Sequence, residues 1–249
     1  QIKLTFTMSA FTRCFRPISN YPSDFSDLVV WLRADSGVTF DIPTKQISAW
    51  ADKSGQNNNA SQPASARQPL RYGYDGQNDK AYIDFNGTSQ SLLSDSNSPI
   101  TTDFTIFLVS KISAVSNTVF GYSNSNVNID MGTDSSGKFK ALVKDGTTTL
   151  TTLTDSSILN KGNIAILKKG GKIIDLEYYD SSTSVFKTDT DVGFNETETY
   201  NQNIFYLGTF SGGALLNGQM QEVIVYNRSL SASEISDVKG YLNLKYKIY

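Results

Sequence analysis

Residues 218–246 read GQMQEVIVYNRSLSASEISDVKGYLNLKY, and this stretch decides the fold. Its first half holds Val223, Ile224, Val225 and Tyr226 in succession, all β-branched or aromatic. Such a run is typical of a β-strand that is apolar on both faces. A strand of this kind has to be covered on both sides, so we predict that it lies inside the fold.

The second half of the same stretch predicts a helix. Ser231 followed three residues later by Glu234 is a capping box, and Leu230 and Ile235 occupy the positions of a hydrophobic staple. An apolar stripe at helical spacing then runs through Ile235, Val238, Leu242 and Tyr246. We therefore predict a C-terminal α-helix with one apolar face, directly after the last strand.

Upstream of this stretch, short apolar runs separated by Gly, Asn, Asp and Ser predict about a dozen strands in all. Residues 104–110 form the most apolar run, and residues 60–76 are predicted to be loop. The other predicted strands are 28–34, 47–50, 81–85, 119–122, 127–131, 138–143, 147–153, 164–168, 172–179 and 205–208. We predict one all-β domain over residues 28–249, an antiparallel two-sheet β-sandwich with a short C-terminal α-helix.

The composition of the chain excludes several classes of protein. It has no histidine and one cysteine, Cys14, so the chain can form neither a Ser-His-Asp triad nor an intrachain disulfide. The net charge of -2 gives no field for nucleic acid, and no apolar run reaches the roughly 18 residues that span a bilayer. Charged residues are only 18%, so neutral polar side chains carry the surface, as in many secreted and virion proteins.

Residues 1–27 are predicted to form an extended N-terminal arm, because Pro17 and Pro22 break any regular element. Two interpretations stay open: the arm packs over its own domain, or it docks on a neighbouring subunit. The docking residues would be Phe11, Arg13, Phe15, Arg16 and Tyr21. The arm lacks the layout of a signal peptide, and Met8 is a candidate for the true start.

Several segments together suggest a family. They are residues 30–38, 47–55, 67–69 (Arg-Gln-Pro), 81–87, 104–111 and 218–246. In this order they resemble the laminin G-like, concanavalin A-like lectin/glucanase family, in the versions found in bacteriophage and other viral structural proteins and in bacterial surface proteins. The resemblance covers residues 24–246 and implies a jelly roll of two antiparallel sheets. It implies no single activity, because lectins, hydrolases, adhesins and passive capsid modules share the fold.

Two local features bear on possible binding sites. Trp31 and Trp50 lie in predicted strands, so we interpret them as core anchors, the alternative being exposed platforms for sugar rings. The loop that follows predicts a turn in which Asp52 or Ser54 bonds nearby backbone amides. Calcium sites occur in the resembled family, so a Ca²⁺ site from Asp52, Asn57 and loop carbonyls is the alternative. With a single carboxylate in this loop, we predict no cofactor and no metal.

Glycosidases of the resembled family carry two Glu and one Asp alternating along one strand. The nearest match here is DLEYYD at residues 175–180, where Asp175 and Glu177 share a face and Asp180 falls on the other unless a bulge intervenes. The order departs from the family pattern Glu-x-Asp-x-x-Glu. We therefore predict no catalytic residue, interpret the acids as partners of lysines in the same hairpin, and interpret Glu222 as a structural partner in the last strand.

Three functions follow from the sequence. The first is a non-enzymatic module at the virion surface, a capsid decoration or tail/fibre protein, that contacts other virion proteins or copies of itself through the arm, and also host-surface glycans. The second is a secreted or cell-surface bacterial carbohydrate-binding or adhesion module. The third is a polysaccharide hydrolase on the same fold. Neither a nucleic-acid partner nor membrane insertion is predicted.

Overall fold

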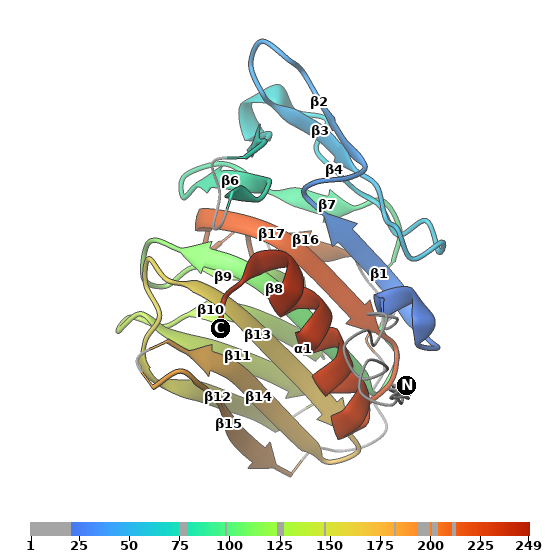
Figure 1. Ribbon diagram of the computed structural model, residues 1–249, viewed down its shortest axis with the longest axis vertical. Coiled ribbons are helices and arrows are strands. Elements are labelled where there is room, and N and C mark those ends of the chain that lie inside the picture. The colour runs from blue at the N-terminus through green and yellow to red at the C-terminus, as the bar shows by residue number, and fades with distance from the viewer. Residues whose placement is uncertain are drawn as a thin grey trace, which may run out of the picture.

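The computed structural model describes residues 21–249 apart from 75–78, 98, 124–126, 147, 182, 194–199, 201–203 and 211–212. Two antiparallel β-sheets face each other in it, and one α-helix lies against the first sheet (Figure 1). The predicted all-β, two-sheet sandwich with a C-terminal helix is therefore confirmed. Among the described residues, no helix combines the length and the apolar character needed to cross a membrane.

The first sheet runs in the order β15-β14-β13-β8-β17-β6-β5, and β1 also pairs with β17. Its central strands β8 and β17 are the most completely buried, as the apolar runs 106–109 and 223–226 within them predict. The bounds are β1 Leu28–Arg33, β5 Leu70–Tyr72, β6 Tyr82–Asn86, β8 Phe104–Ile112, β13 Gly162–Gly170, β14 Ile173–Asp180, β15 Val185–Val192 and β17 Asn217–Tyr226.

The second sheet runs in the order β12-β11-β10-β9-β16-β7-β4-β3-β2. Its longer strands, β9 to β12, form an up-and-down run, and several of the others are only two to four residues long. The bounds are β2 Val38–Phe40, β3 Ile47–Trp50, β4 Ala60–Ser61, β7 Leu92–Ser94, β9 Thr118–Ser123, β10 Val127–Thr133, β11 Lys138–Asp145, β12 Thr148–Ser157 and β16 Phe205–Leu207.

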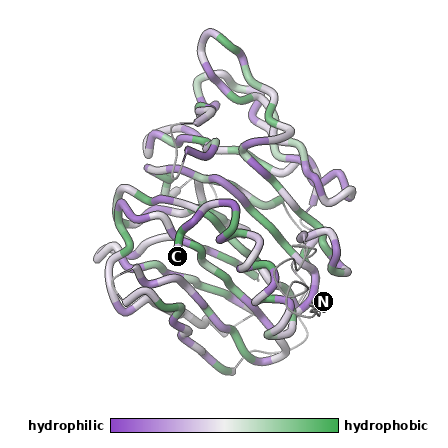
Figure 2. Tube along the Cα trace, viewed as in Figure 1, coloured by the Kyte–Doolittle hydropathy of each residue, from purple (hydrophilic) through white to green (hydrophobic). Residues whose placement is uncertain are grey.

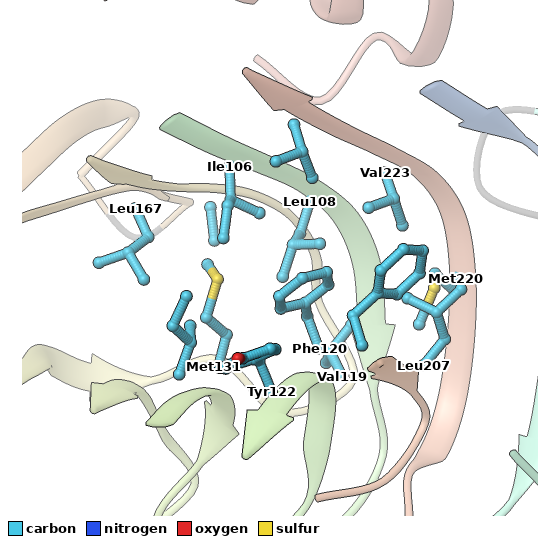
Figure 3. Packing of buried hydrophobic residues seen from close by; sticks show 14 of the residues in the cluster. Ile106, Leu108, Val119, Phe120, Tyr122, Met131, Leu167, Leu207, Met220 and Val223 are labelled. Atoms are coloured by element: carbon cyan, nitrogen blue, oxygen red, sulfur yellow. The ribbon is translucent and has the colours of Figure 1, made fainter. Parts of the chain in front are cut away.

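Two apolar cores result from this arrangement. The larger one lies between the sheets, where Leu108, Phe120 and Val223 pack together (Figure 3). The smaller one lies between the outer face of the first sheet and α1 (Ala232–Tyr246). Figure 2 shows apolar residues recurring along the central strands in both layers.

Strand β17 serves both cores, as its sequence predicts. Val223 and Val225 belong to the core between the sheets, and Ile224 and Tyr226 belong to the core under α1. The predicted capping box is present: the Ser231 side chain accepts from the Glu234 amide, and the Glu234 carboxylate accepts from the Ser231 amide. These contacts begin the helix where the sequence places it.

The prediction of loop over residues 60–76 is wrong in part, because this segment contains β4, β5 and the 3-10 helix η2 (Ser65–Arg67). Strands β2, β7 and β15 were also missed. Each is very short or lies at a sheet edge, where polar side chains alternate without a continuous apolar face. Their pairing with neighbouring strands stabilises them, and this is a tertiary effect that local sequence does not carry.

Candidate functional site

A buried carboxylate fixes the helix that forms one wall of the site. Glu222 of β17 is fully buried, and its Oε1 accepts hydrogen bonds from Trp31 Nε1 at 2.6 Å and Tyr241 Oη at 2.9 Å. Its Oε2 accepts from Lys245 Nζ at 2.7 Å and Tyr246 Oη at 2.6 Å. Three of these donors come from α1, so the carboxylate joins the helix to the first sheet.

Burial keeps the two tyrosines in this network neutral. It is the main reason that the pKa values of Tyr241 and Tyr246 are raised, and the neighbouring Glu222 charge raises them further. Both hydroxyls therefore remain protonated donors over the whole physiological range. The structural interpretation of Glu222 agrees with this geometry, because every bond it accepts holds the fold together.

A groove of about 220 Å³ lies between α1 and the outer face of β13, β14 and β15. Its apolar lining residues are Ile166, Ala232 and Ile235. Its polar lining residues are Lys168, Asp175, Glu177, Thr188 and Lys239. The groove therefore combines an apolar lining with charged groups of both signs.

Strand register sets the order of side chains along the groove. Lys168 pairs with Asp175, and Ile166 with Glu177, in successive rows across β13 and β14. The Lys168 Nζ is 2.8 Å from Asp175 Oδ2, which confirms the predicted pairing of an acid and a lysine within the hairpin. Glu177 instead pairs with Lys239 of α1, whose Nζ lies 2.6 Å from Oε1.

An aromatic group continues the same face of the sheet beyond Glu177. Tyr179 packs on Phe186 with ring centroids 5.5 Å apart, and the ring of Tyr249 lies 4.9 Å from that of Phe186. Lys239 Nζ sits 4.2 Å over the Phe186 ring, so it links the groove to this group. The Tyr249 side chain is 45% exposed and offers ring surface to solvent.

The three acids of β14 do not converge. The register between β14 and β15 is continuous from Ile173 to Asp180, with no bulge. Asp180 therefore lies on the opposite face from Asp175 and Glu177, where its Oδ2 is 2.8 Å from Lys187 Nζ. The alternating trio of acids that the hydrolase alternative requires is absent from this strand.

The loop after β3 is a turn held by one carboxylate. Asp52 accepts from the backbone amides of Trp31 at 2.8 Å, Ser54 at 2.8 Å and Asn58 at 3.0 Å, and from Ser54 Oγ at 2.6 Å. These donors engage both carboxylate oxygens and confirm the turn. In the described part of the chain, no group of three or more His, Cys, Asp or Glu residues is placed to hold a metal ion.

The two tryptophans are core anchors, as predicted. Trp50 is fully buried between the sheets, and Trp31 is buried under α1. Neither ring is available as an exposed platform for a sugar.

Of the predicted docking residues, Phe11, Arg13, Phe15 and Arg16 lie outside the described residues, and their role stays a prediction. Tyr21 is described: it is half exposed and its ring lies 5.6 Å from that of Tyr241. Near it, Tyr226 Oη donates to the Pro22 carbonyl at 2.9 Å. Residues 21–27 of the arm therefore pack on the domain.

The sequence placed Asp175 and Glu177 on one face of a strand but assigned them no binding role, and it missed Lys239, Phe186 and Tyr249. One signal was present: Lys239 lies four residues after Ile235 and so shares a face of the helix with it. Phe186 and Tyr249 meet only through the packing of α1 against β15, which local sequence does not encode.

No family model and no curated protein sequence matches the chain. Solved structures do match its fold. Domain 4 of AbnA, a GH43 extracellular arabinanase from Geobacillus stearothermophilus, in complex with arabinotriose, has a TM-score of 0.64 at 14% identity, covering 85% of this chain and 98% of that one. The sialidase of Trypanosoma rangeli has a TM-score of 0.57 at 15% identity, covering 89% of this chain and 33% of the sialidase.

The receptor-binding domain of botulinum neurotoxin type G has a TM-score of 0.60 at 11% identity, covering 88% of this chain and 52% of that domain. The chain thus spans a third of the sialidase and about half of the toxin domain. At these identities the likeness shows the fold, a β-sandwich that occurs in carbohydrate-active proteins. It leaves the predicted virion setting untested.

Proposed function

We propose that the chain is a non-enzymatic carbohydrate-binding module that holds a neutral oligosaccharide in the groove beside α1. The observation that carries the proposal is one face of the fold, where the groove, with its apolar lining and paired charges, lies next to a partly exposed aromatic group. Ligand sites combine these same elements, an apolar surface with a few placed polar groups.

The chemistry of a sugar matches both the groove and the aromatic group beside it. A pyranose or furanose ring has C–H faces that pack on aromatic rings, here Tyr249 and Phe186. Its hydroxyls both donate and accept, so they bond equally to carboxylates such as Glu177 and to ammonium groups such as Lys239. Because the ion pairs already hold these side chains in place, little conformational entropy is lost on binding.

Binding without hydrolysis is the consistent interpretation. A glycosidase needs a carboxylic acid and a carboxylate flanking the bond that breaks. Here Asp175 and Glu177 are each engaged by a lysine, and Asp180 faces the other way. Domain 4 of the arabinanase, which is nearly matched in length by this chain, is a domain solved with arabinotriose, and this supports a binding role.

The test is a screen of neutral oligosaccharides on an array, followed by titration calorimetry of the best ligand. We expect Tyr249→Ala to weaken binding about two- to tenfold, because loss of one stacking ring costs about 0.5–1.5 kcal/mol. Tyr74→Ala is the matched control: Tyr74 is 81% exposed and, unlike Tyr249, is not part of the Tyr179–Phe186 aromatic group. No bound oligosaccharide, or equal affinity of both variants, would contradict the proposal.

A reducing-sugar assay on the same ligands separates binding from hydrolysis. We expect no turnover by the wild-type chain. Turnover that disappears in Glu177→Gln would establish the hydrolase alternative instead.

The prediction of a virion-surface module, with a secreted or bacterial-surface module as the alternative, rests on the sequence resemblance alone. A groove that binds glycan is compatible with both settings. Localisation therefore stays a prediction.

A further inference from the structure

A second pocket, of about 270 Å³, lies where the 3-10 helix η2, the turn between β6 and β7, and the segment after β16 meet. It shares no lining residue with the groove. Its lining residues are Arg67, Thr88, Ser89, Ser91, Thr209 and Leu215. Arg67 opens the Arg-Gln-Pro segment that belongs to the family resemblance, and no part of the proposed function uses it.

Thr209 is the innermost polar group of this pocket. Its residue is only 2% exposed, and its Oγ1 has no hydrogen-bond partner among the described residues. Gly208 sets its position, because φ is +78° there and an added Cβ would lie 2.5 Å from the Phe85 ring. A buried hydroxyl without a partner costs free energy, so a ligand that bonds to it recovers that cost.

Arg67 supplies the charge of the pocket. Its side chain is exposed, and no ion pair or hydrogen bond of its guanidinium occurs in the part of the chain that the structure describes. Its backbone is fixed, since its amide donates to the Ala64 carbonyl at 2.8 Å and its carbonyl accepts from the Ser91 amide at 3.1 Å. The guanidinium is thus free to bind while its anchor point is rigid.

All the polar side chains that line the pocket are donors or hydroxyls. Arg67 has five N–H donors and no acceptor, and each Ser and Thr hydroxyl can donate. No carboxylate is among the described lining residues. An acceptor-only group with negative charge, such as a carboxylate, fits this set, and Arg binds carboxylates through two parallel hydrogen bonds.

We infer that this pocket binds the carboxylate of an acidic sugar, a single uronic acid residue. Its volume lies just under the ~300 Å³ at which small-molecule sites begin, so it holds one sugar residue rather than a chain. The partly buried Leu215 provides an apolar wall for the C–H face of the ring. The sugar hydroxyls meet the Thr88 and Ser91 side chains, and the carboxylate meets Arg67 and Thr209.

This inference rests on the proposed carbohydrate-binding function but uses a different site. The proposed oligosaccharide site and the inferred uronate site can therefore be disproved independently of each other. Tyr249→Ala should weaken the neutral oligosaccharide and leave uronate binding unchanged, and Arg67→Gln should do the reverse.

The experiment is calorimetric or NMR titration of the full chain with D-glucuronate and D-galacturonate, each beside its neutral parent, glucose or galactose. We expect at least one uronate to bind at least tenfold more tightly than its parent. We expect Arg67→Gln to abolish this preference, and Lys53→Gln, which removes an exposed positive charge elsewhere, to leave it intact.

Thr209→Val tests the buried hydroxyl without damage to the fold. The two side chains have the same shape, and the hydroxyl has no protein partner, so the melting temperature should stay the same or rise. Uronate affinity should fall at least severalfold. Equal affinity for acid and neutral sugar, no measurable binding of either uronate, or unchanged uronate binding in Arg67→Gln would each overturn the inference.

Discussion

Glu222 shows how one residue joins the parts of this protein. Its carboxylate is fully buried, yet it accepts four hydrogen bonds, one of them from the charged Lys245. Lys245 also lies 3.1 Å from Asp35, whose own partner is Arg33 at 3.0 Å. A charge that is buried this completely is tolerated only when it is paired and fully hydrogen-bonded.

We therefore predict that Glu222→Gln lowers the free energy of unfolding by about 3 kcal/mol, because it leaves Lys245 without its buried partner. Glu177→Gln is the matched control. Its ion pair with Lys239 is about one-fifth exposed, so the same substitution should cost less than about 1 kcal/mol. Urea denaturation of both variants measures the difference, and equal losses would show that the Glu222 network does not anchor the helix.

The lowered pKa of Glu234 predicts that the stability of the fold depends on pH in the acidic range. Its bond with Arg228, followed by the backbone bond at Ser231, lowers its pKa from the usual 4.5 to about 2. Since the folded pKa lies below the unfolded one, the stabilisation is complete above about pH 4.5 and is lost as the pH falls towards 2. At neutral pH the wild type should therefore have a higher melting temperature than the Glu234→Gln variant.

The gap in melting temperature between these two proteins should close as the pH approaches 2. Thermal melts of both proteins by circular dichroism at several pH values measure this difference in melting temperature. A gap that stays constant with pH would mean that Glu234 contributes through packing and not through its charge.

At the scale of elements, β17 and α1 can be predicted from their local sequence, whereas the short strands cannot. The apolar run of residues 223–226 in β17 is recognisable by itself as part of a strand at the centre of a sheet. Strands of two or three residues such as β4 and β5 exist because their neighbours pair with them. The turn at Gly208 likewise depends on tertiary packing, since only the packed Phe85 ring shows why glycine is required there.

We predict that Gly208→Ala destabilises the fold by roughly 1–3 kcal/mol, through both the left-handed φ and the clash with Phe85. Gly240→Ala is the control, for which we expect stability to rise. Gly240 lies within α1 with no atom within 4 Å of an added Cβ, so alanine should stabilise the helix by up to about 1 kcal/mol. Shifts of the same sign in chemical denaturation would contradict this account of the two glycines.

At the scale of the whole molecule, the domain closes around two cores, and the segment from residue 21 is part of it. Besides the Tyr226–Pro22 bond, the Asn227 amide donates to the Asp27 carbonyl at 2.9 Å. The predicted boundary of the arm at residue 27 therefore does not mark the end of packing against the domain. Docking on a neighbour through Phe11, Arg13, Phe15, Arg16 and the half-exposed Tyr21 stays a prediction.

If residues 1–20 dock on a neighbouring subunit and do not pack on their own domain, their deletion should leave the melting temperature within about 2 °C. Self-association, or binding to a virion partner, should be lost if Phe11, Arg13, Phe15 and Arg16 dock as predicted. Light scattering coupled to size exclusion measures the mass. An unchanged mass and unchanged partner binding would show that the arm does not dock.

The sequence by itself determined the sandwich class, the central position of β17, the capping box of α1 and the structural role of Glu222. The first three depend on residues close together in the chain, through apolar periodicity or a local hydrogen bond, whereas the partners that give Glu222 its role come from β1 and α1 and are shown only by the tertiary structure. Only the tertiary structure decided that Asp175 and Glu177 pair with lysines from two different elements, and that no bulge moves Asp180 from the opposite face, where the sequence had placed it. It alone joined Lys239, Phe186 and Tyr249 into one group, and brought Thr209 and Arg67 to the same pocket. These groupings arise from strand register and helix packing between distant segments, and local sequence does not specify either.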